Sequence, residues 1–287
     1  MNHTAASLKR VAFAGLALFL ALNAAAQLKT PAASPHSLLE QTVGLTEVAI
    51  DYSRPSVKGR EIFGGLVPYG QVWRTGANQP SKISFSDEVT LGGETIPAGQ
   101  YALYTIPGRD QWTVIVYKST DLWGAMGYDP KGDLVRFVVK PTQLSSPVES
   151  MTFTIDALRN DGAVLNLDWD RTRISMPLQV PTEQKVMAQI ESLKGTPAFE
   201  KPGALFNAAT FYHESGKDLQ TALEWVSKAC ELSERPAYWM YARKARIEMD
   251  LGLKAAAKAS AEKTLELATA GGNPDYQKIA RDMLAQL

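Results

Sequence analysis

The chain has 287 residues, of which 45% are hydrophobic and 21% are charged. This length suggests two domains, and this composition excludes disorder of the whole chain. The 30 basic and 30 acidic residues give a formal net charge of zero, which excludes a global electrostatic attraction to nucleic acid or to an anionic membrane surface. We therefore expect no nucleic-acid partner, and any attraction for anions must be local.

The N-terminus has the layout of a cleavable secretory signal peptide. Lys9 and Arg10 precede the apolar run VAFAGLALFLALNAAA, in which Ala24 and Ala26 occupy the −3 and −1 positions of a cleavage site. The run is short for a membrane span and its end is rich in alanine, and an uncleaved anchor is the alternative. We predict a signal peptide over residues 1–26 with cleavage after Ala26, export to the periplasm or the extracellular space, and no transmembrane span after signal removal.

From about residue 37 to residue 180 the hydrophobic period is two, and turn residues stand at the breaks. The strand-like segments are LTEVAIDYS, SKISFS, GQYALYTIP, QWTVIVYKS, LVRFVVKP, ESMTFTIDAL, AVLNLDWD and RISMPLQV. The segment WTVIVY is apolar on both faces, which predicts a central strand that is covered on its second side. We predict an antiparallel β-sandwich, or a related barrel, over residues 27–180.

A long loop interrupts these strands, and residues 52–78 read YSRPSVKGREIFGGLVPYGQVWRTGAN. Glycine and proline break the strand pattern here, while apolar residues such as Ile62, Phe63 and Trp73 offer a buried anchor. Loops of this length are typically either functional or disordered. The apolar anchor favours a folded, functional loop.

The same loop carries four cations and one acid, Glu61. A rigid loop could hold the cations near one another, where they would bind carboxylate, phosphate or sulfate, and tyrosine and asparagine could add neutral donors. The predicted ligand site consists of Tyr52, Arg54, Lys58, Arg60, Arg74 and Asn78. In the alternative interpretation, the arginines pair with nearby acids or hydrogen-bond loop carbonyls and act as internal staples.

Three stretches resemble a known family: VGLTEVAIDYSRPSVKGREIFGGLVPYGQVWRTGAN, IPAGQYALYTIPG and WTVIVYK. The family is an exported bacterial one, catalogued as domain of unknown function 2911, and the likeness covers residues 35 to 178 approximately. The helical tail after it also resembles the tail that many members carry. This resemblance implies exported relatives, and it implies no established activity.

Beyond Pro181 the hydrophobic period changes to 3.6. A repeat of about 35 residues aligns Gly216, Ala222, Ala229 and Leu232 with Gly252, Ala257, Thr264 and Leu267. This resembles the tetratricopeptide repeat, in which small residues lie where paired helices cross, and a plain helical bundle is the alternative. Because two copies are fewer than normally stand alone, we expect them to lean on the β-domain or on flanking helices 182–194 and 274–286. The predicted fold class is α+β, with the all-α tetratricopeptide-like domain over residues 181–287.

The sequence carries no familiar metal-binding or catalytic motif. His36 and His213 lie in different halves, so we predict no metal site. The single cysteine, Cys230, lies on the apolar side of a helical pattern and is interpreted as a small buried hydrophobe. Because there is no nucleophile elbow, dinucleotide fingerprint or P-loop, we predict no cofactor, and the sequence identifies no catalytic residue.

Three functional hypotheses follow from these observations. The first is a non-catalytic cell-envelope binding or interaction protein, whose loop accepts an anionic small molecule or envelope component and whose helical repeats dock within the chain or against a protein partner. The second is a cofactor-independent enzyme for an anionic or sugar-like substrate, with Arg54, Arg60 and Arg74 as electrostatic stabilisers and Tyr52 or a nearby carboxylate handling protons. The third is a scaffold without a small ligand.

Overall fold

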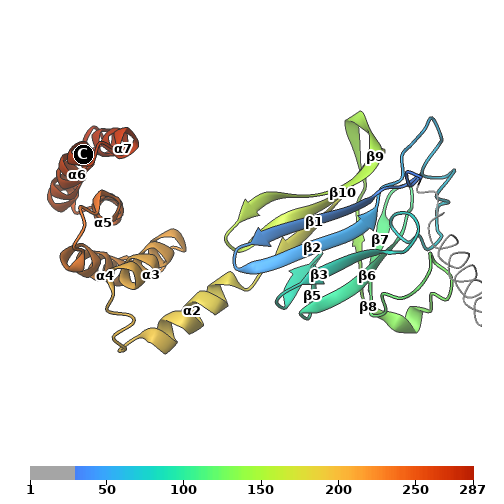
Figure 1. The fold of residues 1–287 in the computed structure, drawn as a ribbon, viewed down its shortest axis with the longest axis horizontal. Helices are drawn as coiled ribbons and strands as arrows, with labels where there is room; N and C mark the ends of the chain where they lie inside the picture. The colour runs from blue at the N-terminus through green and yellow to red at the C-terminus, as the bar shows by residue number, and fades with distance from the viewer. Residues whose placement is uncertain (1–29) are drawn as a thin grey trace, which may run out of the picture. The chain divides into compact units, whose positions relative to one another are not determined.

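A computed structural model describes residues 30–287 of the chain (Figure 1). The chain divides into two compact units, the first ending at Thr182 and the second spanning Glu183–Leu287. The predicted signal peptide, residues 1–26, lies outside the described residues. In the described part of the chain, no helix has the length and apolar character that a membrane crossing requires.

The first unit consists of two antiparallel sheets. One has six strands in the order β1-β2-β3-β6-β7-β8, and the other has four in the order β5-β4-β10-β9. The strands are β1 (His36–Val43), β2 (Thr46–Ser53), β3 (Ser81–Phe85), β4 (Val89–Leu91), β5 (Glu94–Ile96), β6 (Gly99–Ile106), β7 (Trp112–Tyr117), β8 (Asp133–Val139), β9 (Thr142–Arg159) and β10 (Gly162–Gln179). A short 3-10 helix, η1 (Pro130–Gly132), precedes β8.

Alternation along the strands places the core between the two sheets. In β2, Val48 and Ile50 are buried, whereas the residues between them face away from the core. The opposite sheet contributes buried side chains such as Met151, Leu165 and Trp169 to the same cluster. The alternate residues of each strand, such as Ala49 in β2, therefore lie on the outer face of the six-stranded sheet.

Strand β7 is covered on both faces, as the sequence predicted. Its residue Ile115 packs on the outer face with Tyr104, and Leu122 and Tyr128 from the segment before β8 pack against them. The cover is therefore a loop of the same unit, and it spans the β6–β7 half of this face.

The long loop between β2 and β3 is folded. Ile62 is buried, and the Trp73 ring stacks on Trp169 with a centroid separation of 5.7 Å. Phe63 contacts Trp112 edge-on at 4.7 Å. The apolar residues of the loop therefore extend the core of the sandwich, which fixes the loop backbone.

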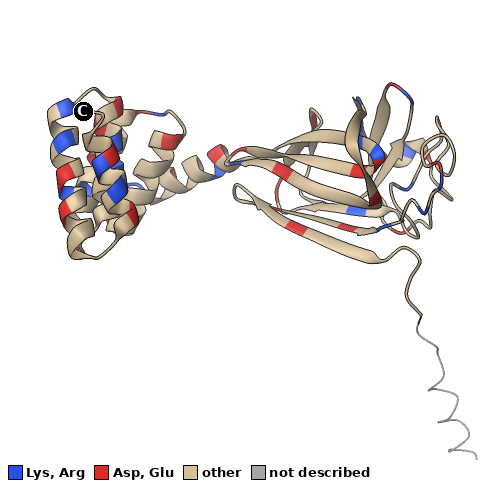
Figure 2. Ribbon diagram, turned by 90° about the horizontal axis from the view of Figure 1, so that it is seen from above, with Lys and Arg blue, Asp and Glu red and all other residues tan. Residues whose placement is uncertain are grey.

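Six helices form the remainder of the described chain: α2 (Thr182–Leu193), α3 (Pro202–Glu214), α4 (Leu219–Leu232), α5 (Tyr238–Asp250), α6 (Lys254–Ala270) and α7 (Pro274–Leu284). Two antiparallel sheets followed by six helices confirm the predicted α+β class. The helices meet at fully buried alanines, among them Ala222, Ala245 and Ala261. Basic and acidic positions are interspersed along the helices (Figure 2). The tetratricopeptide assignment stays a prediction.

Candidate functional site

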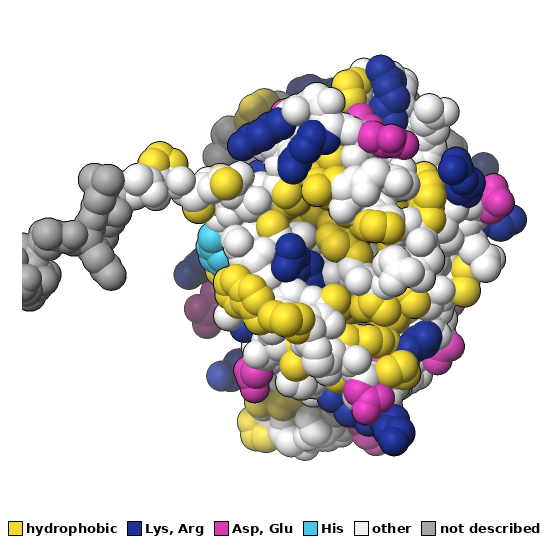
Figure 3. All heavy atoms as spheres, turned by 90° about the vertical axis from the view of Figure 1, so that its right-hand side faces the viewer, with side chains coloured by type: hydrophobic (Ala, Val, Ile, Leu, Met, Phe, Trp, Pro, Cys, Tyr) yellow, Lys and Arg dark blue, Asp and Glu magenta, His cyan; other side chains and the backbone are white. Residues whose placement is uncertain are grey.

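One end of the sandwich gathers the long loop, the turn after β6, the start of β9 and the middle of β10. We call this region, residues 54–80, 107–111, 142–152 and 170–173, the loop end. Gly70 N–H donates to the Pro107 carbonyl at 2.8 Å, and Val57 N–H donates to the Glu149 carbonyl at 2.8 Å. Figure 3 views this end of the first unit and shows hydrophobic side chains in the middle of the face, with Lys and Arg side chains among and around them and Asp and Glu side chains nearer the edge.

Two of the predicted cations hold the loop in place. Arg54 Nε–H donates to the Met151 carbonyl at 2.9 Å, and its Nη2 donates to Thr152 Oγ1 at 2.5 Å. Arg60 donates to the carbonyls of Val57 at 3.0 Å and Ser56 at 2.6 Å. Both guanidinium groups thus satisfy backbone carbonyl acceptors and hold the loop, as the staple interpretation describes.

Arg74 and Lys58 have fewer partners. Arg74 Nη1 donates to the Asn78 carbonyl at 3.3 Å and lies against Gly124, where an added Cβ would be 2.7 Å from it. Lys58 has a left-handed backbone with φ +48°, and its amide N–H donates to Glu149 Oε1 at 3.0 Å. Its side chain is exposed and makes no hydrogen bond or ion pair with the described residues.

Tyr52 and Asn78 border one hollow of about 320 Å³ on the side of the six-stranded sheet. Tyr52 is only 4% exposed, and its hydroxyl accepts a hydrogen bond from the Phe153 N–H at 3.2 Å. Asn78 Nδ2 donates to Ser53 Oγ at 3.1 Å. The other residues of this hollow include Lys82 and Trp123, and none of the four predicted cations lines it. The structure therefore brings Tyr52 and Asn78 together, while the four cations have different partners.

A hollow at the loop end contains two arginines that are not part of the ligand site predicted from the sequence. Arg109 and Arg171 line a space of about 220 Å³ together with Pro141, Thr142, Gln143 and Thr172. The Arg109 guanidinium lies over the Tyr69 ring at 4.9 Å, a contact that leaves its edge N–H groups free. Arg171 Nη1 donates to the Ser145 carbonyl at 2.9 Å. No carboxylate lines this hollow.

Sequence spacing could not have revealed this pair. Arg109 lies in the turn after β6 and Arg171 lies in β10, so only the packing of the two sheets brings them together. Arg171 and Arg173 are two residues apart in β10, but their partners differ. In the structure, Arg173 pairs bidentately with Asp168 at 2.6 and 2.5 Å, and a bulge around Asp170 interrupts the register.

The ionisable groups with shifted pKa values do not favour proton transfer. Burial, followed by the nearby Tyr117, raises the pKa of Tyr104 to about 12. Burial, followed by a hydrogen bond to Asp133, raises the pKa of Tyr128 to about 12. Both hydroxyls are therefore weak acids near neutral pH. Among the described residues, no three metal-ligating side chains are grouped closely enough to hold an ion.

Comparison with known proteins identifies a family over half of the chain. A family model described as "Protein of unknown function (DUF2911)" matches residues 34–178. The matched range contains the loop end, and the helical unit lies outside it. Among curated proteins, none matches the chain.

Proposed function

The chain belongs to the DUF2911 family of proteins of unknown function, and from this premise we propose that its first unit is a non-catalytic binding module. The loop end of the module captures an anionic group of phosphate, sulfate or carboxylate size. The observation that carries this proposal is the hollow of about 220 Å³ that holds Arg109 and Arg171 and no carboxylate. Two unneutralised guanidinium groups facing one space favour a negative occupant.

The surrounding contacts support this assignment of roles. Stacking on Tyr69 holds the Arg109 side chain, which lowers the entropy lost when its N–H groups bind a ligand. Gln143 provides a neutral donor beside the arginines, whereas the Thr142 hydroxyl donates to the Arg173 carbonyl at 3.4 Å. Lys58 is exposed on the same end and adds a positive field that attracts anions. Arg54 and Arg60 keep the loop folded.

The enzyme alternative has weaker support. One of its two proposed proton carriers, Tyr52, is buried, and its hydroxyl is bound to a backbone N–H. Two of its proposed electrostatic stabilisers, Arg54 and Arg60, donate to the fold itself. A catalytic role would need an acid or base beside the arginine hollow, and the lining residues include none.

Thermal-shift measurements with inorganic phosphate, pyrophosphate, sulfate and citrate test the binding proposal. We expect at least one of these anions to stabilise the wild type, because a ligand that binds the folded state raises its stability. The variants Arg109→Ala and Arg171→Ala should lose this shift. Arg159→Ala is the matched control, because Arg159 is an exposed arginine at the far end of β9. Equal shifts in all four proteins, or none in any, would favour the scaffold hypothesis.

A second observation favours a docking function for the helical unit. Helices α3, α5 and α7 line two hollows of about 310 and 340 Å³, and Arg246 lines both. Arg246 is exposed and has no partner among the described residues, while Trp239 and Tyr276 flank it in one hollow. Asp250 and Asp282 line the smaller hollow, whereas in the larger one Glu214 is paired with Arg243 and Arg246 is left over. We propose that the larger hollow of this tetratricopeptide-like unit docks a partner segment that carries a carboxylate.

Peptide display separates this docking proposal from simple packing. Selection of displayed random peptides on the wild-type chain should enrich acidic sequences, and selection on Arg246→Glu should not. Lys258→Glu, on the exposed side of α6, is the control for charge alone. If the wild type and Arg246→Glu enrich the same peptides, the docking proposal fails.

We also propose that the chain is exported after cleavage behind Ala26. The supporting observation is the charged, apolar and small-residue layout of residues 1–26. N-terminal sequencing of protein recovered from a bacterial periplasm should begin at Gln27. Full-length protein that retains Met1 in a membrane fraction would instead support the uncleaved anchor.

A further inference from the structure

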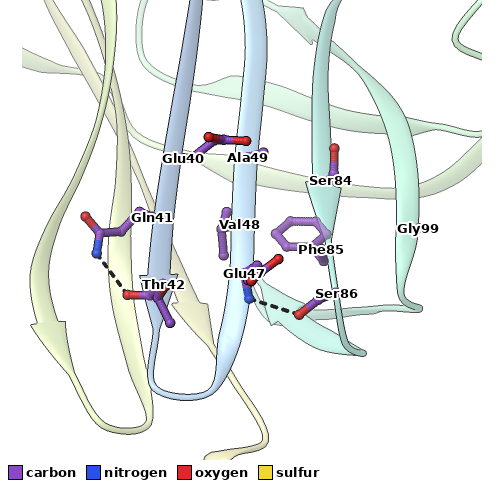
Figure 4. Close-up of a pocket in the computed structure, with 10 residues that line it drawn as sticks. All are labelled: Glu40, Gln41, Thr42, Glu47, Val48, Ala49, Ser84, Phe85, Ser86 and Gly99. Carbon is purple, nitrogen blue, oxygen red and sulfur yellow. Dashed lines mark hydrogen bonds between the residues drawn. The ribbon is translucent and has the colours of Figure 1, made fainter.

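Half of the outer face of the six-stranded sheet has no cover within the described first unit. The aromatic cluster of Tyr104 and Tyr117 fills the β6–β7 half beneath Leu122 and Tyr128. Over β1, β2 and β3 the sheet is instead hollowed by a space of about 460 Å³ (Figure 4). We call this uncovered face the sheet groove.

The floor of the sheet groove consists of small side chains. Ala49 of β2 pairs in register with Glu40 of β1 and with Ser84 of β3, and Gly99 lies beside them at the start of β6. Figure 4 shows the Glu40 side chain reaching from β1 toward Ala49. A ligand can therefore approach the strand backbone closely, with carboxylates from Glu40 and Glu47 at the rim.

A second hollow, the one that Tyr52 and Asn78 border, lies farther along the same strand faces. Successive outward residues of a strand are two apart, so Asp51 follows Ala49, and Lys82 follows Ser84. Asp51 and Lys82 line the second hollow, of about 320 Å³. At a rise of about 3.3 Å per residue, the two hollows together follow the strands for about 20 Å.

An exposed aromatic ring lies at the far end of the groove. Trp123 is 56% exposed and lines the second hollow. Its neighbours are held: Leu122 packs on the tyrosine cluster, and the Gly124 carbonyl accepts a hydrogen bond from the Tyr104 hydroxyl at 3.0 Å. The indole is thus exposed to solvent on a backbone whose neighbours are held, which lowers the entropy cost of stacking a ligand on it.

We propose that the sheet groove binds a neutral oligosaccharide. The carboxylates of Glu40 and Glu47 accept hydrogen bonds from sugar hydroxyls, Lys82 donates to hydroxyl oxygens, and the exposed indole receives the C–H face of a ring. The small floor residues admit rings that a crowded sheet face would exclude. This combination of one flat apolar surface with scattered hydrogen-bonding groups fits a polyhydroxylated chain.

The same groups disfavour other occupants. The groove contains three carboxylates, those of Glu40, Glu47 and Asp51, and one lysine, Lys82. His36 also lies here, but it already pairs with Asp51 at 2.8 Å and is not available to a ligand. An anionic chain would therefore be repelled. An extended peptide would gain no backbone ladder, because the central strands β2 and β3 are already paired on both edges. The polar rim likewise offers little to an acyl chain.

A glycan array followed by isothermal titration tests the sheet groove. We expect the full chain to bind unmodified neutral oligosaccharides on the array, and the strongest of these is then titrated into the variants. Trp123→Ala should weaken binding at least tenfold, and Ala49→Tyr should abolish it by filling the floor. Met126→Ala is the matched control, because Met126 is 71% exposed on the same segment and does not line the hollow. Circular dichroism of each variant checks that the fold is intact.

Each outcome decides the proposal. Binding at least tenfold weaker in Trp123→Ala and lost in Ala49→Tyr, with unchanged binding in Met126→Ala, supports it. Failure of every neutral oligosaccharide at millimolar concentration, a preference for acidic glycans or peptides, or unchanged binding in Ala49→Tyr overturns it. Anion binding at Arg109 and Arg171 is a separate property, because Trp123→Ala should leave any phosphate-induced thermal shift intact.

Discussion

Arginines of the first unit fall into two groups according to their partners. Arg54 and Arg173 donate to groups of the fold, whereas Arg109 and Arg171 keep most of their N–H groups free. The sequence identified the cation-rich loop, but it could not assign these partners. The partners of an arginine depend on which acceptors the fold brings within hydrogen-bond distance. For Arg54, the acceptor carbonyl belongs to Met151 of β9, about one hundred residues along the chain.

The staple role of Arg54 predicts a stability loss that needs no ligand. Arg54→Ala removes two hydrogen bonds from a charged donor to Met151 and Thr152, which should cost about 1.5–3 kcal/mol in urea unfolding. Lys58→Ala is the control, because the Lys58 side chain has no partner in the described unit and should change stability by less than about 0.5 kcal/mol. Equal stabilities of the two variants would contradict the staple role.

The buried Tyr104 and the half-buried Tyr128 predict a loss of stability at high pH. Burial raises the pKa of both Tyr104 and Tyr128 to about 12, above the ordinary value of 10.0. Above pH 10 the unfolded chain ionises these groups while the folded chain keeps them protonated, so the free energy of unfolding falls as pH rises from 10 to 12. In a pH titration followed by tyrosinate absorbance, two tyrosines should ionise only at the pH at which the chain unfolds. Full ionisation below pH 11 in the folded state would contradict the assignment.

The burial of Cys230 predicts that its thiol is unreactive in the folded chain. Burial raises the pKa of Cys230 to about 11, with smaller contributions from neighbouring charges. Thiolate is the reactive form, so a disulfide reagent at pH 8 should label the native chain very slowly. The same reagent should label one thiol per chain after denaturation in guanidinium. Rapid labelling of the native protein would show that the thiol is accessible.

At the scale of elements, the hairpin between β4 and β5 offers a matched pair of glycines. Gly92 and Gly93 both have positive φ, +61° and +94°, as a two-residue hairpin turn requires. A Cβ at Gly92 would lie 2.2 Å from the Phe137 ring, whereas a Cβ at Gly93 meets nothing within 4 Å. Gly93→Ala should cost about 1–2 kcal/mol for its backbone alone.

Gly92→Ala should cost about 1–3 kcal/mol more than Gly93→Ala, because it adds overpacking against Phe137 to the same backbone strain. Urea unfolding of the two variants measures this difference. Equal costs would show that the Phe137 ring moves aside freely.

Hydrophobic periodicity predicted most strands, and its failures have physical causes. Strand β1 reads HSLLEQTV, in which two consecutive leucines obscure the alternation, and it is an edge strand with one paired neighbour. Strands β9 and β10 are 18 residues each, longer than the predicted segments, because bulges break their period without ending the pairing. The start of β9 and the middle of β10 help form the loop end, so the arginine hollow was also missed.

At the scale of the whole molecule, each unit has its own core. The sandwich cluster runs from Val43 to Val180, and the clusters of the helical unit run from Val186 to Leu284. The change of period at Pro181 predicted where the strands stop. Helical periodicity alone could not show which helix faces carry free charges, since this depends on pairings such as that of Arg243 with Glu214.

Separate cores predict that the helical unit folds alone. A chain of residues 181–287 keeps both flanking helices, α2 and α7, whose Ile190 and Met283 are buried in its clusters. Its circular dichroism should be helical, with a cooperative thermal transition. Gradual melting without a transition would show that the helices depend on the β-unit.

Titration of pyrophosphate into the wild-type chain and into the double variant Arg109→Ala/Arg171→Ala tests anion binding at the loop end most directly. Isothermal calorimetry should detect binding to the wild type that weakens as salt rises, because the interaction is charge-assisted. The double variant should bind at least tenfold more weakly, while Arg159→Ala should match the wild type. Pyrophosphate binding of equal strength to all three proteins, or to none of them, would contradict the account.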